Sequence, residues 1–242
     1  MGGGDEGGRF PATRPSALLG ALSDDLELRR VGWERLARAY HPPVYTYLRV
    51  RWRKQPDDAS DLAQAFFERL LERPVLDAYD PARGRFRTYL RLTLDRFVQD
   101  RRREDIAQKR GGALRALAID HAGVEAELAS RGLGAESDPE ALFQAESARQ
   151  LLALALEALK EHCARAEKEE HFAIFERYCF DPDPSYEALA SELGVSVVIL
   201  THRLAYARRH FRRLALELLR DITATDEEYR LEARALLGVE LS

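Results

Sequence analysis

The chain has 242 residues, enough for one large domain or two small ones, and 45% of them are hydrophobic, which is enough to build a core. Charged residues make up 32%, yet the formal net charge is only −4, which excludes a uniformly polybasic nucleic-acid binder. No apolar run approaches the roughly 20 residues of a membrane helix, and the N-terminus lacks the apolar core of a secretory signal. The two cysteines, Cys163 and Cys179, show no metal-binding spacing. We therefore expect a cytoplasmic protein with no membrane contact.

Apolar residues recur along the chain with helical spacing, and strand patterns are almost absent. The sequence therefore predicts an all-α fold, with two helical domains joined by an acidic linker. In chain order we predict a disordered N-terminus (1–14), a first domain (15–115), the linker (116–139), a second domain (140–220) and a helical extension (221–242).

The first domain is predicted to contain several helices with recognisable ends. Ser23 and the two acids that follow it mark the start of one helix. The segment His41-Pro42-Pro43 is predicted to break that helix, because proline lacks an amide hydrogen and clashes with the preceding turn. Asp57 or Asp58 is predicted to cap the next helix, and a long helical run extends from Phe86 to about Lys109.

This long helix is basic. Between Arg83 and Arg110, ten Lys or Arg residues accompany four acids, and aromatic residues are interleaved with them. Such a mixture suits single-stranded or melted DNA, because bases stack on aromatic rings while arginines follow the backbone. Phe86 and Phe97 have core spacing, so the arginines between and after them are the functional candidates. These candidates are Arg87, Arg91, Arg96, Arg101 and Arg102.

The strongest local pattern is a helix-turn-helix over 185–213. Ser185 can cap its first helix, Gly194 lies at the turn, and Ser196 can cap its second helix. Between 196 and 213 there are five arginines and no acid, which favours insertion of the second helix into a major groove over an ordinary helical hairpin with a charged solvent face. We predict base-edge contacts from Val198, Thr201, His202 and Arg203, and phosphate contacts from Arg208, Arg209 and Arg212.

An enzyme would have to use His162, Cys163 and His171. Because Cys163 directly follows His162, the two side chains diverge by about 100° on a helix. Their spacing also fits no common zinc pattern. We therefore predict no catalytic residue, no metal site and no cofactor.

Several segments together resemble a known family. In order and spacing, YHPPVYTYLR, DASDLAQAFFERLL and FRTYLRLTLDRFVQDRRR resemble the first domain of bacterial sigma factors of the extracytoplasmic-function type, and the helix-turn-helix resembles the second domain. The resemblance covers about 25–115 and 140–220, and it is closest to a subgroup with a C-terminal extension. It implies a factor that binds core RNA polymerase and directs promoter recognition and transcription initiation. The residues that match the polymerase-docking helix are Asp58, Asp61, Leu62, Gln64 and Phe67.

The resemblance also assigns DNA contacts. It implies that the long basic helix holds and melts the minus-ten element, and that Thr201, His202 and Arg203 read the minus-thirty-five element. The sequence departs from the family pattern where Ala65 replaces an acid, where Asp95-Arg96 replaces a basic residue followed by Asn, and where Thr201 and Tyr206 replace basic residues. These departures leave the promoter sequence open.

The expected partners are core RNA polymerase and promoter DNA. Regulation is expected through an anti-sigma factor or through self-inhibition by the extension, whose helix can start at Thr225. We considered this extension as a cap on the second domain or as a lock that masks the recognition helix. The alternative function is a helix-turn-helix DNA-binding regulator, or a sigma-like protein that no longer partners polymerase.

Overall fold

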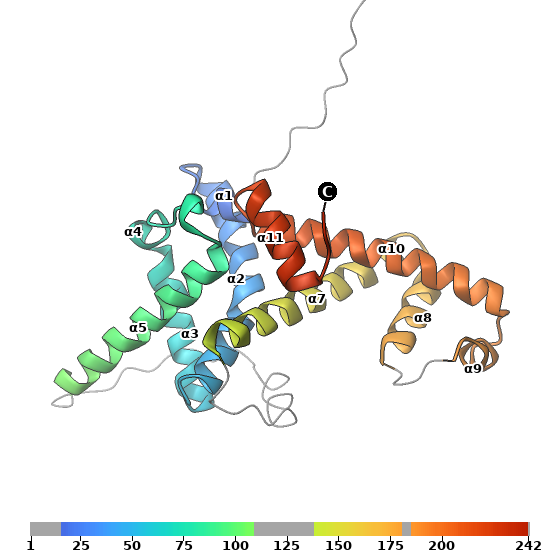
Figure 1. Ribbon diagram of the computed structural model, residues 1–242, viewed down its shortest axis with the longest axis horizontal. Coiled ribbons are helices and arrows are strands. Elements are labelled where there is room, and N and C mark those ends of the chain that lie inside the picture. The colour runs from blue at the N-terminus through green and yellow to red at the C-terminus, as the bar shows by residue number, and fades with distance from the viewer. Residues whose placement is uncertain (1–15, 109–137, 181–184, 242) are drawn as a thin grey trace, which may run out of the picture.

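A computed structural model describes residues 16–108, 138–180 and 185–241. Every regular element in these ranges is a helix, and none of them is a strand, so the predicted all-α fold is confirmed. A broad bundle contains the first helices, and α7 and α10 run side by side away from it toward α8 and α9 (Figure 1). The predicted disordered segment 1–14 and nearly all of the predicted linker 116–139 lie outside the described residues.

The helices vary widely in length. In chain order they are α1 (Ala17–Ala21), α2 (Leu26–Val50), α3 (Pro56–Leu71), α4 (Arg73–Leu76), α5 (Phe86–Gln108), α7 (Pro139–Arg165), α8 (Glu169–Phe180), α9 (Tyr186–Glu192), α10 (Val197–Asp221) and α11 (Asp226–Leu237), with a 3-10 turn η1 (Pro81–Arg83) before α5. Within the described ranges no single helix has the length and apolar character needed to cross a membrane, and only the bent pair α9 and α10, taken together, meets those criteria.

Three predicted N-caps are confirmed. The hydroxyls of Ser185, Ser196 and Thr225 each accept a hydrogen bond from the backbone amide three residues later. Two other cap predictions are wrong. Asp25, rather than Ser23, caps α2 by accepting from two amides of the first turn. Helix α3 starts at Pro56, which suits the first helical position because it has no amide hydrogen to satisfy.

The predicted break at Pro42 and Pro43 is also wrong, because α2 is continuous from Leu26 to Val50. Pro42 cannot donate to the carbonyl of Arg38, four residues earlier. That carbonyl instead accepts a hydrogen bond from the side-chain amide of Gln150 on α7, at 2.9 Å. A tertiary contact therefore supplies the donor that the proline removes, and the helix runs on.

The short helix α1, which the sequence analysis did not predict, packs closely on α2. The contact relies on Gly20 and Gly32, since a Cβ on Gly32 would lie 2.4 Å from the Ala21 nitrogen and 2.5 Å from the Ala17 carbonyl oxygen. The Ala17 amide also donates to Asp221 at the end of α10, at 3.1 Å. The glycines thus permit an approach of two backbones that no other residue type allows.

The buried apolar residues form two cores. The larger core combines α1 to α5 with the first half of α7, the end of α10 and α11. The smaller core combines α8 and α9 with the second half of α7, from Leu159 onward, and the first half of α10. The limit between the cores therefore lies within α7 and α10 rather than near residue 139. The predicted domain limits stay predictions.

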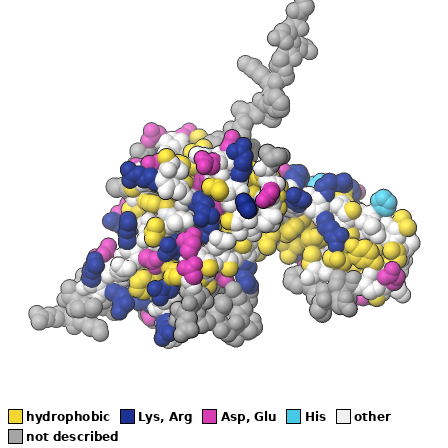
Figure 2. Space-filling model, viewed as in Figure 1, with side chains coloured by type: hydrophobic (Ala, Val, Ile, Leu, Met, Phe, Trp, Pro, Cys, Tyr) yellow, Lys and Arg dark blue, Asp and Glu magenta, His cyan; other side chains and the backbone are white. Residues whose placement is uncertain are grey.

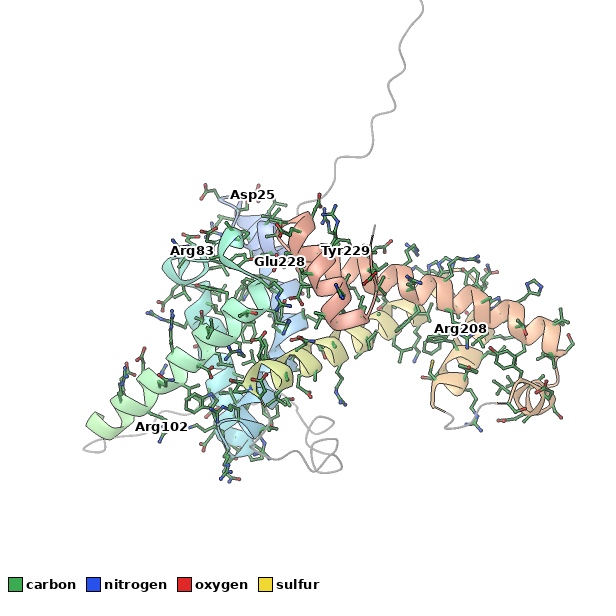
Figure 3. The ribbon with its side chains drawn as sticks, viewed as in Figure 1. Asp25, Arg83, Arg102, Arg208, Glu228 and Tyr229 are labelled. Carbon is green, nitrogen blue, oxygen red and sulfur yellow. The ribbon has the colours of Figure 1, made fainter. Side chains whose placement is uncertain are left out.

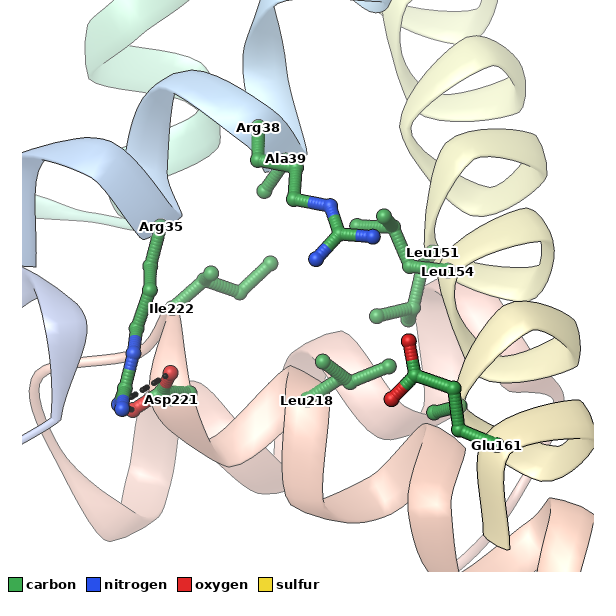
Figure 4. Close-up of a pocket in the computed structure, with 10 residues that line it drawn as sticks. Arg35, Arg38, Ala39, Leu151, Leu154, Glu161, Leu218, Asp221 and Ile222 are labelled. Carbon is green, nitrogen blue, oxygen red and sulfur yellow. Dashed lines mark hydrogen bonds and ion pairs between the residues drawn. The ribbon is translucent and has the colours of Figure 1, made fainter. Parts of the chain in front are cut away.

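A cavity of about 240 Å³ lies where α2, α7 and α10 meet, at the junction of the two cores (Figure 4). Its walls are largely apolar and include Leu151, Leu154 and Leu218. Arg35 at its edge forms an ion pair with Asp221, at 3.1 Å. Packing at this junction is therefore less complete than in the two cores.

Candidate nucleic-acid interface

The five arginines predicted on α5 divide between two environments. Arg96, Arg101 and Arg102 are exposed, and Arg102 projects from the outer part of the helix (Figure 3). Arg87 and Arg91 are turned toward α7 and α11, where their side chains are only 1% and 13% exposed. The inner half of the predicted DNA-binding surface is therefore covered in this conformation.

Arg87 is buried among side chains from two other helices. Its Nε donates to Glu232 of α11 at 3.0 Å, and its Nη1 donates to Glu140 of α7 at 3.2 Å. Its Nη2 donates to the side-chain oxygen of Gln144 at 3.3 Å. These partners satisfy the fork of donors that a guanidinium presents, so Arg87 has no donor directed at a phosphate here.

Arg91, one turn further along α5, continues this chain of alternating charges. It donates to Glu140 at 2.8 Å and to Asp95 at 2.8 Å. Asp95 in turn accepts from the Tyr47 hydroxyl at 3.1 Å and from the Trp52 indole at 3.0 Å. Burial, together with the charge of Asp95, raises the pKa of Tyr47 to about 12, so Tyr47 remains a donor at neutral pH.

The start of α5 is capped from α11 by Glu228. Its Oε1 accepts from the Phe86 amide at 2.6 Å, and its Oε2 accepts from the Ala224 amide at 2.7 Å. Burial raises the pKa of Glu228 in spite of these two donors. A carboxylate at a helix N-terminus is favourable because the helix dipole is positive there. Helix α11 therefore holds α5 by both a cap and an ion pair (Figure 3).

The aromatic rings of α5 point into the bundle. Phe86 is 2% exposed, the Tyr89 hydroxyl donates to the Val75 carbonyl, and Phe97 packs on Phe66 with ring centroids 5.6 Å apart. In this conformation they offer no open stacking platform for bases. The outward face carries instead two exposed residues that the sequence analysis missed, Leu92 and Gln99. They could have been found by counting helical turns from Arg96.

The predicted docking residues of α3 also divide between its faces. Asp58 and Asp61 are exposed, and Leu62 and Gln64 are partly exposed. Phe67 is 8% exposed and packs edge-on against Trp33, with ring centroids 5.8 Å apart. Phe67 thus packs α3 against the bundle from its buried face, while Asp58 and Asp61 lie on its exposed face.

The segment predicted as a helix-turn-helix consists of α9, a short turn and α10. Helices α9 and α10 meet at 101°, and Gly194 has φ +64 at the turn, a backbone conformation in which glycine carries no steric penalty. The Val195 amide donates to the Ala190 carbonyl at 3.0 Å, which closes the end of α9. Leu193, which follows the last residue of α9, is 39% exposed.

Most predicted DNA contacts on α10 share one exposed stripe. The spacing of Val198, Thr201, His202, Arg209 and Arg212 places them on one face, and all five are exposed. Basic side chains gather over α10 beside a broad apolar surface in Figure 2.

Arg203 lies off this stripe, and Arg208 lies at its edge. Arg203 is turned toward α8, where it forms an ion pair with Glu170. Arg208 lies over the ring of Tyr178 at 4.5 Å and donates to the Tyr186 hydroxyl at 3.2 Å (Figure 3). These two arginines therefore help to hold α8, α9 and α10 together.

A histidine cluster joins α7, α8 and α10. The rings of His162 and His210 stack with centroids 4.3 Å apart, and His162 Nε2 shares a hydrogen bond with the Tyr206 hydroxyl at 3.0 Å. His171 meets the edge of Tyr206, and Lys168 Nζ lies 4.0 Å from that ring. Burial, and then the positive charges around them, lower the pKa of His171 and His210.

We expect the smaller core to lose stability as the pH falls below 6.5, the ordinary pKa of histidine. A lowered pKa means that the folded state binds protons more weakly than the unfolded state, so this stability is complete above pH 6.5 and is lost on acidification. Facing groups Arg203, Arg209, Arg213 and Lys168 oppose protonation, and Glu170 favours it.

The measurement is urea unfolding at pH 7.5 and 5.5. The variant His210→Gln should reduce the loss, whereas His202→Gln, at an exposed position about two turns earlier on α10, should leave it unchanged. Equal pH dependence in all three proteins would contradict the prediction.

The comparisons with known proteins identify one segment. Residues 36–106, which run from α2 to near the end of α5, match the family model described as sigma-70 region 2. No curated protein and no solved structure matches the chain. Members of the sigma-70 family are transcription initiation factors rather than enzymes. The matched segment folds as a helical bundle with an arginine-rich outer helix, and the likeness to sigma-70 region 2 is confined to these residues.

Proposed function

We propose that this protein is a sigma factor of the extracytoplasmic-function type, which binds core RNA polymerase and directs promoter recognition and transcription initiation in the cytoplasm. The observation that carries the proposal is the region 2 match over 36–106, together with the exposure of Arg96 and Arg102 on its last helix. A region 2 domain indicates a role in promoter recognition, with core polymerase and promoter DNA as partners.

Each exposed surface takes one role in this proposal. The outer face of α3, with Asp58 and Asp61, docks on the polymerase. The outer half of α5, with Arg96, Arg101 and Arg102, holds the melted minus-ten strand, because arginines follow a backbone whose bases are unstacked. The exposed stripe of α10 enters the major groove at the minus-thirty-five element.

The test mixes the full chain with core RNA polymerase. We expect the two to co-elute in gel filtration and the mixture to give run-off transcripts from a library of genomic promoters. A charge reversal on the outer face of α3, Asp61→Arg, should reduce co-elution. Specific duplex binding without any complex with polymerase would instead support the alternative, a helix-turn-helix regulator.

We further infer that the described conformation is a closed form of this factor. The lock hypothesis expected the extension to cover the early turns of α10. Helix α11 lies elsewhere. It packs on α7, on the later part of α10 and on the start of α5. Glu232 of α11 forms an ion pair with Arg87, and Glu140 of α7 forms one with Arg91. The C-terminal extension and α7 therefore compete with DNA for the inner half of α5. Binding of polymerase would have to separate these helices from α5.

The closed form predicts a gain of binding when its acids are neutralised. The double variant Glu140→Gln and Glu232→Gln keeps the side-chain shapes but removes the charges that hold Arg87 and Arg91. We expect a severalfold higher affinity for single-stranded DNA, measured by fluorescence anisotropy at fixed salt. The matched control, Glu157→Gln with Glu161→Gln, removes two charges from exposed positions on α7. An equal gain in the control would contradict the closed form.

The structure predicts different roles for Arg212, on the exposed stripe of α10, and Arg203, which lies off it. Arg212→Ala should weaken binding to all duplexes and lower the slope of log affinity against log salt by about 0.9, because one phosphate contact is lost. Arg203→Ala should leave that slope nearly unchanged, since Arg203 is paired with Glu170. Equal slopes for Arg212→Ala and the unmodified chain would remove Arg212 from the phosphate-contacting set.

A further inference from the structure

We propose that the first two turns of α10 recognise the 5-methyl groups of thymine in the major groove. The inference rests on the proposed function, because it takes α10 as the helix presented to DNA. Val198 is the first residue of the exposed stripe and is 67% exposed. The thymine methyl is the apolar group that the major groove offers to such a side chain.

The next members of the stripe also present methyl groups. The hydroxyl of Thr201 donates to the Val197 carbonyl at 2.7 Å, so its proton is already engaged and its methyl group remains for outside contacts. Ala205 follows one turn later and is exposed. Val198, Thr201 and Ala205 therefore form a row in which no side chain has a free hydrogen-bond donor. His202 is the polar side chain beside this row.

No arginine in the first two turns of α10 is placed to hydrogen-bond a base. Arginine reads guanine by donating two hydrogen bonds, which requires a guanidinium directed into the groove. Arg203, the arginine nearest in sequence, is held by Glu170 of α8. Arg209 and Arg212 extend the same stripe further along the helix, where their positive charge complements the phosphates of duplex DNA. The apolar row and the two arginines together fit one partner, a DNA duplex. Its thymine bases would face the first turns of α10 in the major groove.

The test uses the full chain with core RNA polymerase, and duplexes selected from a random library by binding to that complex. Each thymine in the upstream part of the selected site is replaced by uracil, which lacks only the methyl group. Loss of one buried methyl should weaken binding about four-fold at each contacted position. We expect this loss at one or two adjacent thymines, and no loss at the others.

Two variants test whether the preference for thymine over uracil depends on the exposed stripe of α10. Val198→Ala should reduce the preference for thymine over uracil at one position, because the shorter side chain buries less of the thymine methyl. Ile199→Ala, which shortens an apolar side chain that is 44% exposed but lies off the stripe, should retain it. Equal binding of the thymine and uracil duplexes, or full discrimination by Val198→Ala, would overturn methyl recognition while leaving promoter binding intact. Failure of the complex to select any duplex would overturn the proposed function itself.

Discussion

Replacing Glu232 with alanine is expected to lower the free energy of unfolding by about 3–5 kcal/mol, because it leaves a buried guanidinium without its closest charged partner. Arg87 is 1% exposed and Glu232 is 3% exposed, so water cannot replace the lost carboxylate. Glu140 and Gln144 still accept from the other nitrogens of Arg87, which keeps the cost within this range. The measurement is urea denaturation followed by circular dichroism, with the midpoint and the slope fitted separately.

Two controls separate burial from simple loss of charge. The double variant Arg87→Met with Glu232→Leu should recover most of the loss, since apolar side chains of similar size often replace a buried ion pair at little cost. Glu157→Ala removes an exposed partner of Arg38 and should change stability by less than about 1 kcal/mol. If Glu232→Ala were as mild as Glu157→Ala, α11 would not be packed on α5 in solution.

Gly32→Ala is expected to destabilise the protein by about 3 kcal/mol, the upper end of the cost of overpacking. In an exposed helix the same substitution stabilises by about 1 kcal/mol, because alanine has the higher helix propensity. Here the new Cβ would meet three backbone atoms of α1 at 2.4–2.8 Å. Backbone atoms cannot move aside as a flexible side chain can, so α1 must shift away from α2. Thermal unfolding of the variant gives the sign directly.

Gly20→Ala is the matched control on the partner helix. Its new Cβ would have one close neighbour, the Leu28 carbonyl oxygen at 3.1 Å, which a small adjustment can relieve. We expect a clearly smaller loss than for Gly32→Ala. A gain in stability for Gly32→Ala would show that α1 does not rest on α2.

Much of the local structure could be predicted from the sequence. The helical periods predicted α5 and α10, and the caps at Ser185, Ser196 and Thr225 lie where the residue types predict them. These features depend on neighbours within about one helical turn, which the sequence displays directly. The α2 prolines were misread for the opposite reason. The donor that replaces the missing amide comes from Gln150, on a helix more than a hundred residues away in the chain.

The departures from the sigma-factor pattern gain a physical explanation in the fold. Asp95 stands where a basic residue was expected, and it is the acceptor for Tyr47, Trp52 and Arg91. Tyr206 also stands where a basic residue was expected, and it contacts the histidines between α7, α8 and α10. Both residues serve internal packing. For this reason a comparison of motifs alone could not assign them a role.

The residues of the candidate interface show where sequence and tertiary structure divide. The sequence by itself determined that α5 and α10 are basic helices and which stripe of α10 is polar or small, because charge and period are properties of a single helix. Only the tertiary structure decided that Arg96 and Arg102 stay open while Glu140 and Glu232 cover Arg87 and Arg91. An arginine has the same chemistry in both settings, and its role depends on which carboxylates the packing of distant helices places beside it.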